Sequence, residues 1–225
     1  MKPEEFSDKL IAELDKTKPR STAPFRKVAK KYSKLLKNEK AEFVLQVAKV
    51  ILKTGKYRWV AYELIYEHSQ TFQSLDRKKL ETLGEGINSW WTVDSFARTL
   101  SGPAWLAGLI SLDTIQDWAK SDDLWWRRAA LVSTVALNIR THGGKGDVKR
   151  TLAVCKMLVN DHEDMIVKAL SWALRALVVH DTRAVREFLD RNQGQIAPRV
   201  HREVKNKLNT GLKNPRIQKS TGKGN

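Results

Sequence analysis

The chain has 225 residues, with 41 Lys and Arg against 25 Asp and Glu, and its formal net charge is +16 at pH 7. This length fits one large domain or two small ones, and a hydrophobic content of 41% is enough for a sizeable core, which excludes disorder of the whole chain. The single cysteine, Cys155, excludes an intramolecular disulfide framework and an all-cysteine metal site.

The positive charge is concentrated in two segments. Residues 16–40 carry a net charge of +9 and residues 199–225 a net charge of +7, so the rest of the chain, taken together, is neutral. Clustered Lys and Arg side chains can displace the counterions condensed around a polyanion. The two segments therefore indicate a nucleic-acid partner, although a basic C-terminal segment is also typical of a solvated tail.

Helical periodicity runs through almost the whole chain, and neither sustained two-residue alternation nor a hairpin signal indicates strands. The first apolar stripe begins at Phe6 and ends at Leu14, and Ser21 or Thr22 caps a second helix. Further helices are predicted at residues 42–53, 57–67, 76–83, 91–100, 113–120, 122–138, 147–158, 164–178, 182–192 and 196–212. Short polar breaks separate these helices, which indicates an antiparallel stack.

The second predicted helix combines an apolar stripe with many basic residues. Its expected buried positions are Phe25, Val28, Ala29, Tyr32 and Leu36. This spacing leaves six basic residues mostly on solvent faces: Arg26, Lys27, Lys30, Lys31, Lys34 and Lys37.

An internal repeat favours a solenoid over a bundle. The segments that begin at Asp123 and at Asp164 share the pattern Asp, two residues, apolar, basic, two residues, small, and they are offset by 41 residues. This offset lies within the period of about 40–47 residues that is typical of HEAT-type helical repeats. We therefore predict an all-α fold, a curved α-solenoid (α-α superhelix) of antiparallel HEAT-like repeats. It forms a single domain over residues 1–212 with a concave DNA-binding face, and a basic, flexible tail covers residues 213–225.

Two clusters that resemble chemical sites are interpreted as structural. The glycine-rich stretch from His142 to Asp147 lacks the Gly-Lys-Ser/Thr ending and the preceding strand of a phosphate-binding loop, so we interpret it as a helix connector. The acidic stretch from Asp161 to Asp164 precedes an amphipathic helix, where capping and the helix dipole favour acids. We expect no metal and no cofactor.

The tryptophans are more informative. The chain has eight Trp, and five of them fall in the groups Trp90-Trp91, Trp125-Trp126 and Trp172. Core packing is the ordinary role of a single Trp. Trp90, however, precedes Asp94 by four residues, so on a helix the indole and the carboxylate share a face, in apolar surroundings. An Asp in such a place is also typical of a helix cap or a buried hydrogen-bonding partner.

Three strings together resemble the AlkD-type alkylpurine DNA glycosylases, a family of DNA alkylation repair enzymes with HEAT-like repeats. They are Ser-Trp-Trp-Thr-Val-Asp-Ser at residues 89–95, Trp-Trp-Arg-Arg-Ala-Ala at residues 125–130, and Lys-Ala-Leu-Ser-Trp-Ala-Leu-Arg at residues 168–175. The resemblance implies that Asp94 is the catalytic aspartate, that Trp90 and Trp172 contact the lesion and its deoxyribose, and that Arg128 contacts the DNA backbone.

The resemblance further implies a monofunctional hydrolase of base excision repair, which cleaves the N-glycosidic bond of N3- or N7-alkylated purines in duplex DNA. We expect Arg127, Lys27, Lys30, Lys31 and Lys34 to add backbone contacts, and basic positions of residues 199–213 to add non-specific affinity. With no apolar stretch of signal-peptide or membrane-spanning length, we expect no membrane partner and a cytoplasmic monomer, associated with the nucleoid in a bacterium.

Two other hypotheses remain open from the sequence. The first is a non-catalytic HEAT-like module that binds nucleic acid or a protein partner through the same concave face. The second is a scaffold for an acidic protein. The first alternative predicts duplex binding without release of a base, and the second predicts little affinity for DNA.

Overall fold

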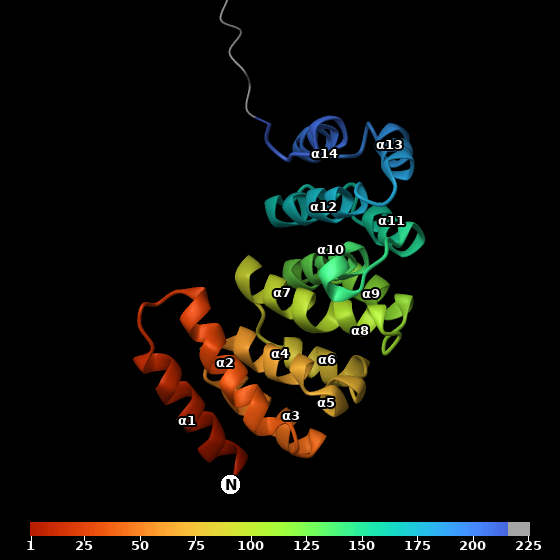
Figure 1. Cartoon of the computed structure of the whole chain (residues 1–225). Helices are drawn as coiled ribbons and strands as arrows, with labels where there is room; N and C mark the ends of the chain where they lie inside the picture. The colour runs from red at the N-terminus through yellow and green to blue at the C-terminus, as the bar shows by residue number, and fades with distance from the viewer. Residues whose placement is uncertain (216–225) are drawn as a thin grey trace, which may run out of the picture.

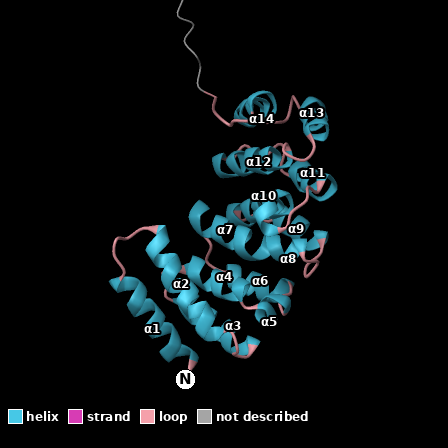
Figure 2. Cartoon of the chain, viewed as in Figure 1, coloured by secondary structure: helices cyan, strands magenta, loops and turns pink. Residues whose placement is uncertain are grey.

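The computed structural model describes residues 1–215, and these residues form helices and loops without a strand (Figure 2). The fold class predicted from the sequence, an all-α solenoid of antiparallel helical repeats, is confirmed. The helices are α1 (Pro3–Lys16), α2 (Thr22–Leu36), α3 (Ala41–Lys53), α4 (Arg58–Glu67), α5 (Ser69–Gln73), α6 (Arg77–Gly84), α7 (Trp90–Phe96), η1 (Ala97–Ser101), α8 (Gly102–Leu106), α9 (Leu112–Ala119), α10 (Leu124–Asn138), η2 (Arg140–His142), α11 (Val148–Met157), α12 (Asp164–Leu177), α13 (Thr182–Arg191) and α14 (Pro198–Thr210).

The helices stack in chain order from α1 at one end of the molecule to α14 at the other (Figure 1). One row is formed by α4, α7, α10, α12 and α14, each of which packs against the next. A second row includes α9 and α11, which pack against each other, and α13, which packs against α12. The first row carries Trp90 and Asp94 on α7, Arg127 and Arg128 on α10, and Trp172 on α12, so its packing decides which of these side chains meet.

The repeat found in the sequence corresponds to α10 and α12, which lie side by side in the first row. Asp123 caps α10, because its carboxylate accepts a hydrogen bond from the backbone N–H of Trp125 at 2.7 Å. Asp164 is the first residue of α12 and complements the positive end of the helix dipole. The small residues of the pattern, Ala130 and Ser171, are fully buried, which allows neighbouring helices to approach closely.

The structure differs from the sequence prediction after residue 96. A single helix was predicted for residues 91–100, but α7 continues through the π-helix η1 into α8. The sequence Ser101-Gly102-Pro103 is typical of a helix end, yet Pro103 lies in the first turn of α8, where its missing N–H is tolerated. Gly102 has no room for a side chain, since a Cβ atom there would lie 2.7 Å from the Cβ of Ala136 on α10.

The sequence prediction also missed α5, a helix of one turn. His68 caps it, because its Nδ1 accepts a hydrogen bond from the backbone N–H of Thr71 at 3.2 Å. Elsewhere, the predicted connector at residues 142–147 is confirmed, since it links η2 to α11. The predicted buried positions of α2 are also confirmed, apart from the half-buried Phe25.

One hydrophobic core runs through the stack, from Phe6 on α1 to Val204 on α14. Cys155 is buried in this core and has no disulfide partner, and burial raises the pKa of its thiol. Within residues 1–215, no helix combines the length and the apolar character that a membrane crossing requires. Of the predicted tail at residues 213–225, residues 216–225 lie outside the described part of the chain.

Buried polar groups join α14 to α12 next to Trp172, one of the predicted site residues. The hydroxyl of Ser171 donates to a carboxylate oxygen of Glu203 at 2.6 Å, and Arg199 donates to the other oxygen at 2.9 Å. Burial alone raises the pKa of Glu203, but these hydrogen bonds and the charges of Lys213 and Arg199 lower it by more, so the pKa lies below the ordinary 4.5.

This network predicts a pH-dependent contribution to stability. Because the pKa of Glu203 is lowered on folding, its ionised form stabilises the folded state above pH 4.5, and that stabilisation is lost as the pH falls through the lowered pKa. The Glu203→Gln variant should therefore unfold at lower urea concentration than the wild type at neutral pH, and this difference should narrow in acid. Urea unfolding of both proteins across this pH range measures it. A difference that stays constant contradicts the assignment.

Candidate functional site

The predicted catalytic residue, Asp94, lies on α7, whose N-terminus is closed by a capping box. Ser89 Oγ accepts from the backbone N–H of Thr92 at 3.3 Å, and Thr92 Oγ1 accepts from the backbone N–H of Ser89 at 3.1 Å. The cap makes Trp90 the first helical residue and places Asp94 one turn later on the same face. Phe96 points the other way, into a cluster of aromatic rings that anchors α7 in the core.

Asp94 and Arg128 form a bidentate ion pair between α7 and α10. Arg128 Nε donates to Oδ1 of Asp94 at 3.0 Å, and Nη2 donates to Oδ2 at 3.0 Å. The third nitrogen of Arg128, Nη1, donates to the backbone carbonyl of Met165 on α12 at 2.5 Å. A single guanidinium therefore connects α7, α10 and α12 at the carboxylate.

The electrostatics of Asp94 are a balance of opposing effects. Its side chain is 16% exposed and that of Arg128 is 6% exposed, so both charges are largely withdrawn from water. Burial raises the pKa of Asp94, and this effect outweighs the hydrogen bonds and charge of Arg128 and the charge of Arg98, which lower it. The carboxylate is thus oriented but more basic than an ordinary Asp, and two of its approximately four lone-pair sites remain free of Arg128.

The tryptophans of the site differ in their surroundings. Trp90 and Trp91 are 53% and 56% exposed, and their rings meet edge to face with centroids 5.9 Å apart. Trp172 on α12 is half-buried against the core, and the guanidinium of Arg98 lies over its ring at 5.6 Å from the centroid. Arg98 contacts Trp172, and its charge lowers the pKa of Asp94, so Arg98 belongs to the same region of the molecule as these two residues.

Sequence reasoning missed Arg98 and Trp91. The signal for Arg98 was available, because Arg98 extends the four-residue spacing of Trp90 and Asp94 by one more step. What the spacing could not show is the partner, since Trp172 is distant in sequence. Trp91 could have been noted as a second exposed indole only if the direction of α7 relative to the core had been known.

Arg127, the other predicted backbone contact on α10, faces a different set of groups. Its Nε donates to Asp161 at 2.9 Å, and its Nη1 donates to the carbonyls of Ser121 and Asp122 at 3.0 and 2.8 Å. Both side chains of the Arg127–Asp161 pair are less than one-fifth exposed. Asp161, which the sequence placed in a cluster typical of helix capping, is thus occupied by this ion pair, and no group of His, Cys, Asp and Glu within residues 1–215 is arranged to hold a metal.

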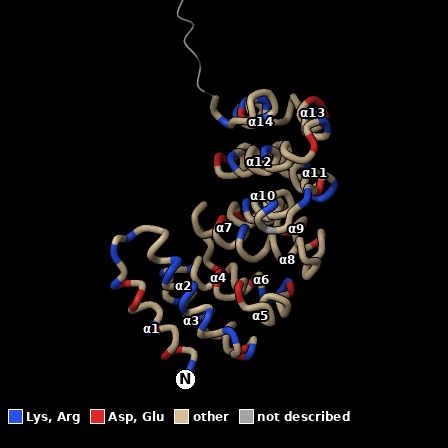
Figure 3. The backbone as a smooth tube through the Cα atoms, viewed as in Figure 1, with Lys and Arg blue, Asp and Glu red and all other residues tan. Residues whose placement is uncertain are grey.

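The basic residues predicted on α2 are all exposed, and they follow the helix and the loop before it (Figure 3). Lys27, Lys30 and Lys34 extend into solvent without an ion pair to any described residue. Lys31 is also exposed but binds both carboxylate oxygens of Glu13 on α1, at 2.9 and 2.7 Å. Because α2 packs against α4, and α4 packs against α7, these lysines lie at a distance from Asp94 along the stack.

The basic residues of α14 and of the segment that follows it divide in the same way. Arg199 on α14 and Lys213 after it pair with acids, and Lys207 donates to the carbonyl of Gly211. Arg202 and Lys205 are exposed. Only part of the formal positive charge of this segment is therefore presented to solvent.

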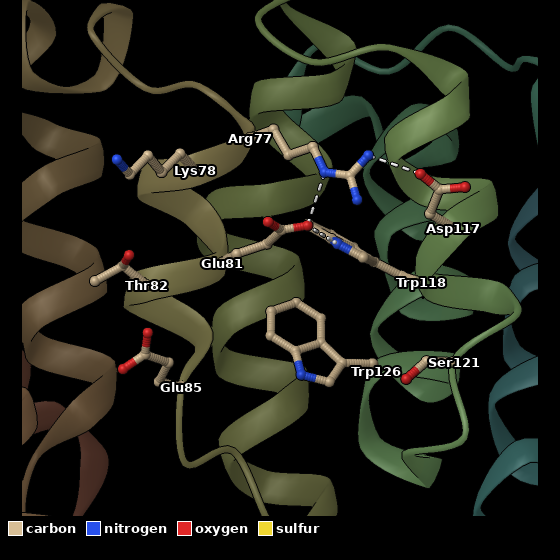
Figure 4. Close-up of a pocket in the computed structure, with 9 residues that line it drawn as sticks. All are labelled: Arg77, Lys78, Glu81, Thr82, Glu85, Asp117, Trp118, Ser121 and Trp126. Carbon is tan, nitrogen blue, oxygen red and sulfur yellow. Dashed lines mark hydrogen bonds and ion pairs between the residues drawn. The ribbon is translucent and has the colours of Figure 1, made fainter.

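A separate cavity of about 540 Å³ opens between α6, α9 and α10 (Figure 4). Three of its charged groups are joined, because Arg77 donates to Glu81 at 2.8 Å and to Asp117 at 2.7 Å, and the indole of Trp118 also donates to Glu81, at 3.0 Å. None of the predicted site residues lines it. The contacts across this cavity join neighbouring helices, and the cavity is not part of the Asp94 region.

Residues 20–208 match the model of a protein family described as DNA alkylation repair enzyme. This match covers all the predicted site residues and extends from the loop before α2 to α14. Comparison with curated proteins and with solved structures finds no match.

The geometry of the ion pair predicts how the carboxylate titrates. Asp94 should titrate above the ordinary 3.8 of an Asp side chain, because burial dominates its pKa. In Arg128→Gln the pKa should rise further, since the hydrogen bonds and charge that oppose burial are lost. Carbon-13 NMR of the side-chain carboxyl measures both values. The matched control is Arg77→Gln, which removes an exposed guanidinium from the separate cavity and should leave Asp94 unchanged. An unchanged or lowered pKa in Arg128→Gln contradicts the assignment.

Proposed function

The chain belongs to the family of DNA alkylation repair enzymes, so it acts on DNA in repair, and we propose that it is a monofunctional glycosylase that releases cationic N3- or N7-alkylated purines from duplex DNA. The observation that carries this proposal is the largely buried carboxylate of Asp94, oriented at both oxygens by Arg128 and flanked by the exposed indole of Trp90. A non-catalytic binding module has no evident use for such an arrangement.

The proposed reaction is hydrolysis at C1′ of the deoxyribose. Alkylation gives the purine a positive charge, so the base leaves with the electron pair of the N-glycosidic bond and becomes neutral. Positive charge then develops on the sugar, where a carboxylate stabilises it, as in glycoside hydrolysis in general. Water forms the new bond to C1′, and Asp94 takes up the proton that the water loses. No cofactor or metal enters this scheme.

Each of the other site residues supports that step in a distinct way. Trp90 and Trp172 contact the lesion and its deoxyribose, and an indole face attracts a cationic base by roughly 0.5–2 kcal/mol, depending on how far water is excluded. Arg128 keeps both carboxylate oxygens in place. The contact of Arg128 with the DNA backbone stays a prediction, and it would use N–H groups that remain after the bonds to Asp94 and Met165.

The lysines of α2 supply affinity without sequence preference in this proposal. Lys27, Lys30 and Lys34 are exposed and have no ion pair to a described residue, which suits contacts with phosphates. Such contacts hold the duplex in register but do not read bases. Arg127 and Lys31 are held by acids in the free protein, so they would contribute to DNA binding only after exchanging those partners. We expect Lys27, Lys30 and Lys34 to dominate.

The first test of the function is release of 7-methylguanine or 3-methyladenine from alkylated duplex DNA. We expect the wild type to release these bases and Asp94→Asn to be slower by about 100- to 1,000-fold, the usual cost of losing one group that stabilises the transition state. Binding to the same duplex should be retained, because the variant keeps every basic residue. Asp117→Asn, in the separate cavity, is the matched control and should keep full activity.

The outcomes of this test separate the hypotheses. Wild-type protein that binds duplex DNA but releases no base supports the non-catalytic module, and weak binding even at low salt supports an acidic protein as partner. Unchanged release by Asp94→Asn removes Asp94 from the catalytic role.

The role of the α2 lysines is tested by the salt dependence of duplex binding. Replacing Lys27, Lys30 and Lys34 with Gln should make the negative slope of log association constant against log salt concentration less steep by about 3, since each phosphate contact contributes roughly 0.9. The charge-matched control replaces Lys149, Arg183 and Arg191 of the second row with Gln, and its slope should equal that of the wild type. Titrations by fluorescence anisotropy at several salt concentrations give both slopes. Equal losses in the two triple variants would show that only net charge matters.

A further inference from the structure

Arg98 is a cation of the Asp94 region with no part in the scheme above. It lies in the π-helix η1, which follows α7 directly, so that Trp90, Asp94 and Arg98 occur at four-residue intervals along one helical face. Turns of π-helix are rare and are found frequently at functional sites. The same element that presents Trp90 and Asp94 therefore also presents a guanidinium.

Arg98 is supported from a second helix. Its guanidinium carbon lies 5.6 Å from the centroid of the Trp172 ring on α12, within the range of a cation–π contact. Although burial raises the pKa of Asp94, the charge of Arg98 counteracts part of that rise, together with Arg128. Trp172 thus holds the guanidinium near the carboxylate without a direct ion pair between them.

The hydrogen-bonding capacity of Arg98 is free. The side chain is exposed, and among residues 1–215 it has no hydrogen-bond or ion-pair partner. Stacking on an indole uses the face of a guanidinium and leaves its N–H edge available for two parallel hydrogen bonds to a phosphate. Arg128 offers a clear contrast, because it is 5% exposed and all three of its nitrogens donate to protein oxygens.

Charge decides which part of DNA this guanidinium suits. A cationic base on the same face of Trp172 would meet a like charge, whereas a phosphate would meet an opposite one. A phosphate contact also carries no sequence information, which fits an enzyme that meets lesions in any sequence. The ligand chemistry that Arg98 recognises is therefore the DNA backbone.

We propose that Arg98, supported by Trp172, binds the backbone phosphate next to the alkylated nucleotide and so positions that nucleotide at Asp94. This inference rests on the proposed function, because it names the partner of a residue within the same site. Arg98 is a positioning residue, since it contacts the phosphate and not the reacting atoms. Fixing the nucleotide in this way contributes to the rate by holding the sugar where the carboxylate can act.

The test measures binding, so that it does not depend on catalysis. The probe is a duplex with one 7-methylguanine whose sugar carries fluorine at C2′, which disfavours positive charge on the sugar and keeps the base attached. In a series of such duplexes, each phosphate near the lesion is replaced in turn by a neutral methylphosphonate. For the wild type, we expect an affinity loss of about tenfold at one position next to the lesion, the typical effect of losing one charge-assisted contact.

The variants identify the side chain responsible. Arg98→Ala should bind the probe duplex without methylphosphonate about tenfold more weakly than the wild type does. A methylphosphonate at the sensitive position should then cause no further loss of affinity. Arg98→Gln, which keeps the stem of the side chain, should give the same result and replaces Arg98→Ala if that variant does not fold. Arg183→Ala on α13 removes an equal charge from an exposed site, and it should retain the wild-type pattern.

One result overturns the inference: folded Arg98 variants that show the same loss as the wild type at every methylphosphonate position. Base release is measured in parallel. Release by the wild type together with an Arg98-independent pattern refutes only the role of Arg98. An Arg98-dependent pattern without any release refutes only the glycosylase function and leaves the phosphate contact in place.

Discussion

The ion pair between Asp94 and Arg128 is the constraint on which the site depends. One guanidinium binds both oxygens of the carboxylate and a carbonyl of α12, so α7, α10 and α12 meet at one point. Removing two charges from water is costly, and a buried pair of this kind is often no more stable than a hydrophobic replacement. The pair connects three helices and orients the carboxylate at both oxygens, which an apolar contact could not do.

The remaining charges of the molecule divide into paired and unpaired groups. Acids neutralise Arg77, Arg199 and Arg127. The pairs of Arg77 and Arg199 each join two helices of the stack, and the pair of Arg127 joins α10 to the loop before α12. Lys27, Lys30 and Lys34 of α2 lack such partners among the described residues and face solvent, and so does the guanidinium of Arg98. An exposed cation keeps its hydration and therefore needs no ion pair with the protein. Such an unpaired cation can bind a polyanion without first losing a protein contact.

The tryptophans illustrate how one residue type serves two purposes. Trp105 and Trp118 are almost fully buried, and they fill space between neighbouring helices. Trp90 and Trp91 are more than half exposed, at the first turn of α7. Large exposed indoles lose the free energy of burial, so their presence beside Asp94 needs a reason outside the fold. The stacking contact with a lesion or a sugar that we propose for Trp90 would supply that reason.

Much of the fold could be predicted from the sequence because the relevant forces are local. Apolar spacing acts over a few residues, and together with the repeat shared by α10 and α12 it correctly indicated an all-α solenoid. The helix α5 was missed because five residues are too few to show helical periodicity. The continuation through η1 into α8 was missed because tight packing at Gly102 against α10 overrides a local signal for a helix end.

The candidate site could likewise be predicted from the sequence only in part, and tertiary packing decided the rest. The spacing of Trp90 and Asp94 placed an indole and a carboxylate on one helical face, and the resemblance of three strings added Arg128 and Trp172. Only packing decided that Arg128 binds Asp94 across 34 residues and that Arg98 lies over Trp172. The sequence by itself determined which side chains each helix presents, because periodicity is local. Which of them meet was decided by the stacking of α7, α10 and α12, because burial of their shared core sets the distances between helices.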